Sequence, residues 1–188
     1  MPGSESGRFL SIDELDQLPP DACVAALAPL FEGAPRFLAR LCAARPFGDP
    51  DGLFGTAREV AGSMPEAGQV ELIDAHPRLG APPSSVSELS FVEQGYDREA
   101  AAAKAGTAEA GRSQLAAELD RLNAEYEALF GFRYCVFVAG QPRTALLPGI
   151  HAALAADRDA ELARALDAVI DIAADRLARL NRTAGPER

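Results

Sequence analysis

A histidine next to a chain break is the first candidate for chemistry. His76 lies in the sequence DAHPRLG, residues 74–80, where a proline and then a glycine end a predicted helix. We expect its ring to project from this break, and an imidazole, with an ordinary pKa of about 6.5, can serve as a general acid or base. The alternative is a structural histidine that caps the preceding helix at its terminal carbonyl groups.

A second group of polar side chains lies in the sequence SFVEQ, residues 90–94. On one helical turn, Ser90, Glu93 and Gln94 would present a hydroxyl, a carboxylate and an amide on the same side. The amide of Gln94 donates and accepts hydrogen bonds, which suits an amide-rich ligand. The alternative is a capping box of Ser90 and Glu93, followed by a solvated polar end.

An arginine near the end of the chain is the third candidate. Arg176 follows Ala173 by three residues and so borders the apolar stripe of a predicted helix. There it could pair bidentately with a carboxylate. The alternative is a surface arginine whose aliphatic stem covers the edge of the core. The other histidine, His151, is interpreted as structural.

Charge and composition exclude several classes of function. The 188 residues include 18 basic and 28 acidic side chains, a net charge of -10, which disfavours binding to nucleic acid or to an anionic membrane. Two distant histidines and no paired cysteines disfavour a zinc site. The single lysine, Lys104, lies in an Ala-rich stretch where nothing would depress its pKa, so Schiff-base and pyridoxal phosphate chemistry are disfavoured as well.

The cysteines and the two ends of the chain predict a compartment. Cys23, Cys42 and Cys135 are scattered and odd in number, which favours buried thiols in a reducing compartment over disulfide bonds. The N-terminus lacks the apolar core of a signal peptide, and no stretch approaches the roughly 18 apolar residues of a membrane span. The chain lacks a C-terminal SKL peroxisomal tail. We therefore expect a soluble, cytoplasmic protein.

Helices must position these side chains, because apolar residues recur at helical spacing along most of the chain. A capping box at Ser11 and Glu14 begins the first helix, and prolines begin or end several others. Two long helices carry apolar stripes: Leu115, Leu119, Leu122, Tyr126 and Leu129, and Leu162, Leu166, Val169, Ala173, Leu177 and Leu180. Gly131 is expected to end the earlier of these two helices.

Only residues 132–138, FRYCVFV, favour a strand locally. One such run cannot form a sheet, so an extended segment packed against helices is expected. We predict an all-α fold, a single compact domain over 1–188. It would be folded from about residue 8 to 182, with disordered termini and a mobile Ala-rich stretch at 98–112.

In combination, these motifs resemble the OHCU decarboxylase family, whose substrate is 2-oxo-4-hydroxy-4-carboxy-5-ureidoimidazoline. The family motifs occur in order and cover most of the chain. They are Arg45-Pro46-Phe47, His76 to Gly80, Ser90 to Gln94, Leu122-Asn123 with Tyr126, Phe130-Gly131-Phe132, and Ile172 to Leu177. Each motif is weak alone, but their order and spacing are specific.

The resemblance implies an all-helical homodimer without metal or organic cofactor, acting between urate and (S)-allantoin, with functional coupling to urate oxidase and hydroxyisourate hydrolase. It implies that His76, Glu93 and Arg176 are catalytic. It also implies substrate contacts from Pro77, Ser90 and Gln94, and from the backbone of Tyr134, Cys135, Val136, Phe137 and Val138.

The chain departs from the usual family pattern at two places beside the motifs. Arg78 stands where many members have aspartate, and Gly95 to Arg98 replace the more usual Ala-Gly-Leu. These departures leave open a related decarboxylase that acts on another ureido or imidazole carboxylate. A second alternative, from another class of function, is a non-catalytic helical dimer that binds a ureide or a partner protein.

Overall fold

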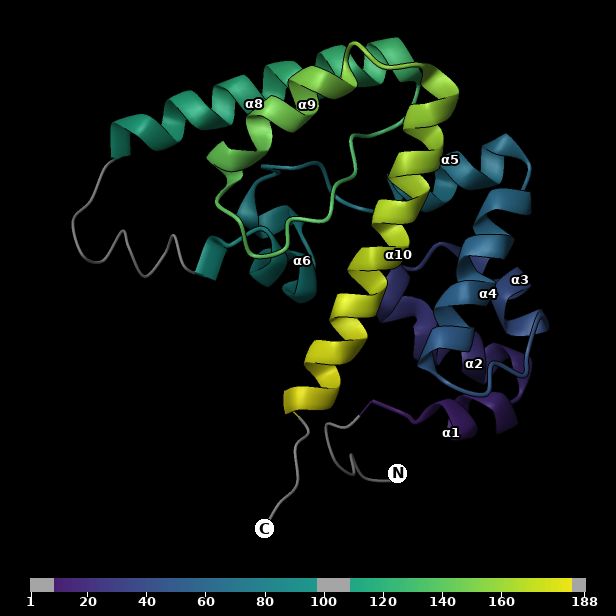
Figure 1. Ribbon diagram of the computed structural model, residues 1–188. Coiled ribbons are helices and arrows are strands. Elements are labelled where there is room, and N and C mark those ends of the chain that lie inside the picture. The colour runs from purple at the N-terminus through teal and green to yellow at the C-terminus, as the bar shows by residue number, and fades with distance from the viewer. Residues whose placement is uncertain (1–8, 98–108, 184–188) are drawn as a thin grey trace. The chain divides into compact units, whose positions relative to one another are not determined.

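The computed structural model describes residues 9–97 and 109–183. Over these residues the fold is all-α, as predicted: helices make up the regular secondary structure and no strand occurs. Contacts group the chain into two compact units (Figure 1). The first unit is Met1–Ala75 with Val169–Arg188, and the second is His76–Ala168.

The first unit contains the predicted short helices. Both hydrogen bonds of the capping box at Ser11 and Glu14 are present, which confirms the first helix start. Helix α3 packs against α2, α4 and α5, and rings of Phe31 and Phe37 lie 4.8 Å apart in the core. The helices are α1 (Ile12–Gln17), α2 (Pro20–Leu27), η1 (Ala28–Phe31), α3 (Pro35–Ala43), α4 (Pro50–Ser63) and α5 (Glu66–Asp74).

The prediction of three buried thiols was wrong for two of the cysteines. Cys23 in α2 and Cys42 in α3 form a disulfide bond, and their Cα atoms lie 6.1 Å apart. Both are buried, and the contact between their helices places the two sulfur atoms together. Spacing along the chain could not show this pairing, because it depends on helix packing. Cys135 is a buried free cysteine, as expected.

The second unit contains α8 (Glu109–Phe130), with α9 (Leu147–Ala153) running alongside it (Figure 1). Leu119, Leu122 and Tyr126 are fully buried, whereas Leu129 is 56% exposed, so its placement in the stripe was wrong. Phe130 takes the buried position at the end of the helix. The other elements are η2 (Pro83–Ser85), α6 (Glu88–Glu93) and η3 (Arg143–Leu146).

Two further expectations for the second unit are confirmed. Gly131 ends α8 with φ of 80°, a conformation that glycine adopts without steric cost. Residues 133–138 have no regular secondary structure, which agrees with the predicted extended segment. His151 on α9 is exposed, with its Nε2 atom 3.8 Å from Glu118.

The last helix contributes to both units. Helix α10 (Arg158–Thr183) gives residues 158–168 to the second unit and 169–183 to the first. In its predicted stripe Leu166, Val169, Ala173 and Leu177 are buried, while Leu162 and Leu180 are partly exposed. The helix therefore bears core residues of each unit on one continuous element.

Several predictions concern residues outside the described part of the chain. The termini lie there, and so does most of the Ala-rich stretch 98–112, whose last four residues begin α8. The prediction of a single domain over 1–188 stays a prediction. Among the described residues, no helix combines the length and apolar composition needed to span a membrane.

Candidate functional site

The loop after α5 places His76 at the start of the second unit. His76 follows the last residues of α5 directly and its side chain is 4% exposed. Pro77 is partly exposed, and Gly80 has φ of 83°, which a side chain would strain. The chain break expected at this motif is present, and its histidine is buried.

Side chains from elsewhere in the second unit hold the backbone of this loop. Arg133 Nη1 donates to the carbonyl of His76 over 2.9 Å. Asn123 Nδ2 donates to the carbonyl of Leu79, also over 2.9 Å. Because the loop forms no helix or strand, these donors replace the hydrogen bonds that regular structure would supply.

Helix α6 carries the second motif, and it corrects one interpretation. Ser87 caps this helix by accepting a hydrogen bond from the Ser90 N–H group. Ser90 therefore lies inside the helix, where it is 2% exposed, and the alternative of a capping box from Ser90 and Glu93 was wrong. Glu93 is the last residue of α6 and is partly exposed.

The amide of Gln94 joins α6 to the loop. Its Oε1 atom accepts from the Gly80 N–H group over 2.8 Å, and its Nε2 atom donates to the Arg78 carbonyl over 3.2 Å. The hydroxyl of Tyr96 donates to the Ala81 carbonyl next to them. In this structure, Gln94 thus aligns the His76 loop with α6 through both ends of its amide.

The two departures from the family pattern have structural partners. Arg78 pairs bidentately with Glu127 of α8, with Nε to Oε1 at 2.7 Å and Nη2 to Oε2 as the second contact. The hydrogen bond to Glu127 raises the pKa of Arg78. At the other departure, Arg143 Nη1 donates to the Tyr96 hydroxyl over 2.9 Å, and the guanidinium lies 4.4 Å from the centre of the Tyr96 ring. Arg98 lies outside the described residues.

The extended segment is largely buried and accepts a hydrogen bond from a side chain of α10. Tyr134, Cys135 and Val138 are buried, and Val136 and Phe137 are partly exposed. Arg164 Nη1 donates to the Cys135 carbonyl over 2.9 Å. Burial is the main reason that the pKa of Tyr134 is raised.

Arg176 belongs to the first unit and is fully buried, so its alternative as a surface arginine was wrong. Its Nη2 atom lies 2.8 Å from Oε1 of Glu32, and its Nη1 atom donates to the carbonyls of Pro29 and Leu30. Glu32 has φ of 51°, which places it in the left-handed region. Arg176 thus fixes the turn after η1, and its catalytic role stays a prediction.

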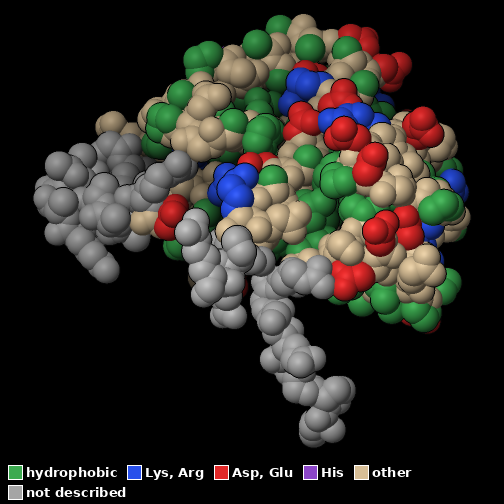
Figure 2. Space-filling view, turned by 60° about the horizontal axis from the view of Figure 1, so that its bottom comes forward, with side chains coloured by type: hydrophobic (Ala, Val, Ile, Leu, Met, Phe, Trp, Pro, Cys, Tyr) green, Lys and Arg blue, Asp and Glu red, His purple; other side chains and the backbone are tan. Residues whose placement is uncertain are grey.

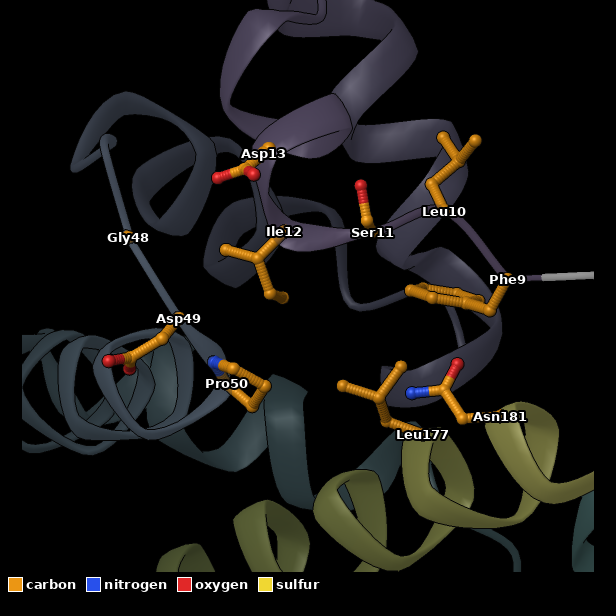
Figure 3. A pocket seen from close by; sticks show the side chains of 10 residues that line it. All are labelled: Phe9, Leu10, Ser11, Ile12, Asp13, Gly48, Asp49, Pro50, Leu177 and Asn181. Atoms are coloured by element: carbon orange, nitrogen blue, oxygen red, sulfur yellow. The ribbon is translucent and has the colours of Figure 1, made fainter.

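A pocket of about 390 Å³ lies in the first unit (Figure 3). Asp13 and Asp49 lie on one side of it, and Phe9 and Asn181 on the other. No predicted site residue lines it, and no lysine or arginine does among its described lining residues. Two carboxylates without a cation would repel a carboxylate substrate, so this pocket is not the candidate site.

The sequence-predicted site residues other than Arg176 all belong to the second unit. They are His76, Pro77, Ser90, Glu93, Gln94 and Tyr134 to Val138. Among the described residues, no cluster of three or more His, Cys, Asp or Glu side chains could hold a metal ion. On the face in Figure 2, acidic and basic side chains lie near one another, and its described atoms form no extended basic patch.

Sequence reasoning assigned no role to the side chains that hold the site backbone, Arg133, Asn123 and Arg164, although Asn123 belongs to one of the family motifs. Two of them carried a signal. Arg133 is a charged residue inside an apolar run, and Asn123 is an amide beside the apolar stripe of α8. Either feature suggests a buried donor with a specific partner. Arg164 carried no such signal.

Comparisons with known proteins show the family and the fold. The OHCU decarboxylase family model matches residues 16–178. A relative from Haloferax volcanii, named 2-oxo-4-hydroxy-4-carboxy-5-ureidoimidazoline decarboxylase, is 28% identical over 169 residues, 90% of this chain and 95% of that protein. The uric acid degradation bifunctional protein PucL of Bacillus subtilis is 29% identical over 170 residues, which are 90% of this chain and 32% of PucL.

Two crystal structures share the fold. An (S)-allantoin synthase has a TM-score of 0.61 and 16% identity, with 91% of this chain and 54% of that chain covered. An OHCU decarboxylase crystallised in the presence of (S)-allantoin has a TM-score of 0.60 and 20% identity, with 82% of this chain and 96% of that chain covered. Since the family model spans most of the sequence, from residue 16 to residue 178, the chain belongs to the OHCU decarboxylase family.

Proposed function

We propose that the protein converts 2-oxo-4-hydroxy-4-carboxy-5-ureidoimidazoline to (S)-allantoin in urate degradation, without a metal or organic cofactor. The observation that carries the proposal is membership of the decarboxylase family over residues 16–178. The relative that matches at 95% of its own length bears the name of this activity, which supports the same substrate.

The chemistry of the substrate explains why the proposed reaction needs no catalytic lysine. The bond between C4 and the carboxylate breaks, its electron pair forms a C4=C5 double bond, and the electrons of the C5=N imine move to nitrogen, which takes a proton. The resulting enol then loses its hydroxyl proton while C5 gains one. The substrate supplies its own electron sink, so the protein has to orient it, exclude water and direct one proton to one face of C5.

The proposed roles follow the types of side chain. His76 and Glu93 handle the C4 hydroxyl and the C5 proton, because imidazole and carboxyl groups are the side chains that most often serve as general acids and bases in enzymes. Arg176 and Gln94 anchor the anionic, amide-rich substrate. Pro77, Ser90 and the backbone of Tyr134 to Val138 complete the contacts, with main-chain groups facing the edges of the ureido-imidazoline.

The wider setting is also part of the proposal. We infer a cytoplasmic homodimer that acts after urate oxidase and hydroxyisourate hydrolase. The name of PucL, a bifunctional protein of uric acid degradation with a region similar to this chain, supports coupling to the same pathway.

One experiment separates this function from the alternatives. Urate oxidase and hydroxyisourate hydrolase generate the unstable intermediate from urate, and circular dichroism follows the product with and without this protein. Faster appearance of optically active (S)-allantoin is the expected result. A rate equal to the spontaneous background, which yields racemate, would instead favour a binding protein, and the same assay with other ureido or imidazole carboxylates would identify a related decarboxylase.

A further inference from the structure

The extended segment Tyr134 to Val138 obtains its shape from side chains. Residues 133–138 form no helix or strand, although Tyr134 and Cys135 are buried. Buried carbonyl groups need hydrogen-bond donors, and here one comes from a local turn and one from a distant helix. The Val138 carbonyl accepts from the Gln141 N–H group in a turn, and the Cys135 carbonyl accepts from Arg164 of α10.

Arg164 is held in place on three sides. Its Nε atom donates to Oε1 and Oε2 of Glu161, at 3.1 and 2.9 Å, one turn earlier on α10. Its guanidinium lies 5.0 Å from the centre of the Tyr134 ring, within range of a cation–π contact. Nη1 then reaches the Cys135 carbonyl at 2.9 Å. The fixed planar fork of arginine suits these simultaneous contacts, and lysine could not reproduce them.

Glu161 is in turn fixed from α8. It is 5% exposed, and its Oε2 atom accepts from the hydroxyl of the fully buried Tyr126 over 2.8 Å. The Tyr126 ring also packs edge-on against Tyr134, with ring centres 5.2 Å apart. The hydrogen bonds thus run from Tyr126 through Glu161 and Arg164 to the backbone of Cys135. The Glu161 carboxylate of this ion pair is buried and the Arg164 side chain is 36% exposed, so the pair differs from a fully exposed one, which would contribute little to stability.

We propose that Arg164 is a positioning residue, which sets the backbone of Tyr134 to Val138 so that its main-chain groups can bind the substrate. This inference rests on the proposed function, in which that backbone contacts the ureido-imidazoline. Main-chain groups cannot rotate to follow a ligand as side chains can. A displacement of about 1 Å in such a contact is enough to weaken it strongly.

The test compares Arg164→Met with Arg164→Lys and with two controls. Arg121→Met removes an exposed arginine of α8 whose side chain pairs with Glu118 and Glu125 on the same helix. Leu53→Ala truncates the core of the first unit and reproduces a loss of stability without touching the segment. Peptide mapping of thiol labelling at Cys135, whose side chain is buried, measures opening of the segment without any substrate.

For Arg164→Met we expect labelling of Cys135 to accelerate by at least about tenfold, and KM to rise by about tenfold with kcat nearly unchanged, because uniform binding is lost. Arg164→Lys should give a labelling rate and a KM between those of the wild type and Arg164→Met. Both control variants should show the wild-type labelling rate and KM. Unchanged labelling, or faster labelling with wild-type KM, would overturn the proposal. If the wild type shows no decarboxylation, the proposed function fails, and the claim that the segment binds the substrate fails with it. The rates of Cys135 labelling still report whether Arg164 holds the segment in place.

Discussion

Arg133 links the two irregular segments of the second unit, because its Nη1 atom donates to the carbonyl of His76 over 2.9 Å. Arg133 lies at the start of the extended segment, and His76 begins the loop after α5. The position of the candidate catalytic histidine and the position of the candidate substrate-binding backbone therefore depend on each other.

The first prediction concerns this link. Arg133→Met should reduce kcat/KM by about tenfold, because small misplacements of a catalytic group are costly. The free energy of unfolding should fall by only about 1 kcal/mol, as for one hydrogen bond. Steady-state kinetics and urea unfolding measure the two effects. Arg121→Met serves as the control. An Arg133→Met protein with unchanged kcat/KM would show that the hydrogen bond from Arg133 to His76 has no part in catalysis.

The second prediction concerns the two proton-handling residues. His76→Ala and Glu93→Gln should each lose most turnover while the protein stays folded, because general acid–base catalysis contributes about a hundredfold or more. His151→Ala and Glu125→Gln are matched controls on exposed positions of α9 and α8. Near-wild-type turnover in His76→Ala or Glu93→Gln would remove the role assigned to that residue.

Helix positions were predictable because local signals determine them. The capping box of Ser11 and Glu14 and the glycine after α8 depend on neighbours in the sequence. Residues 132–138 favour a strand locally but form none, because the described residues contain no strand with which they could pair. The disulfide of Cys23 and Cys42 and the exposure of Leu129 depend on how helices pack, so the sequence pattern did not show them.

The candidate site divides in the same way. The motifs around His76 and Ser90 identified residues that belong to the same unit. The donors that satisfy the backbone between them, such as Asn123 and Arg164, lie far away in the sequence. Their role follows from carbonyl groups that a loop leaves without regular partners, and such groups are apparent only once the chain is folded.

The third prediction separates structure from catalysis at Arg176. Arg176→Met would leave the partly buried carboxylate of Glu32 without its cation, and should lower the free energy of unfolding by about 3–5 kcal/mol. Glu32→Gln retains Arg176, so it should keep most turnover. The double variant should recover part of the lost stability, since the uncompensated carboxylate is gone. Thermal unfolding and turnover are measured together, and wild-type turnover in the double variant would contradict a catalytic role for Arg176.

The fourth prediction concerns stability at alkaline pH. Burial, followed by the hydrogen bond to Glu161 and its negative charge, raises the pKa of Tyr126 above its ordinary value of 10.0, against a smaller opposing effect of Arg164. Above about pH 10 the unfolded chain loses this proton while the folded protein keeps it, so the stability that Tyr126 contributes is present below that pH and declines above it.

Phenylalanine does not titrate. Tyr126→Phe should therefore start less stable at neutral pH, because a buried hydrogen bond is lost, yet lose less stability between about pH 9 and about pH 11. Urea unfolding midpoints across this range measure the difference. Tyr134 has a raised pKa as well, but it is present in both proteins and cancels. Parallel curves for the two proteins would show that the pKa of Tyr126 is not raised in the folded protein.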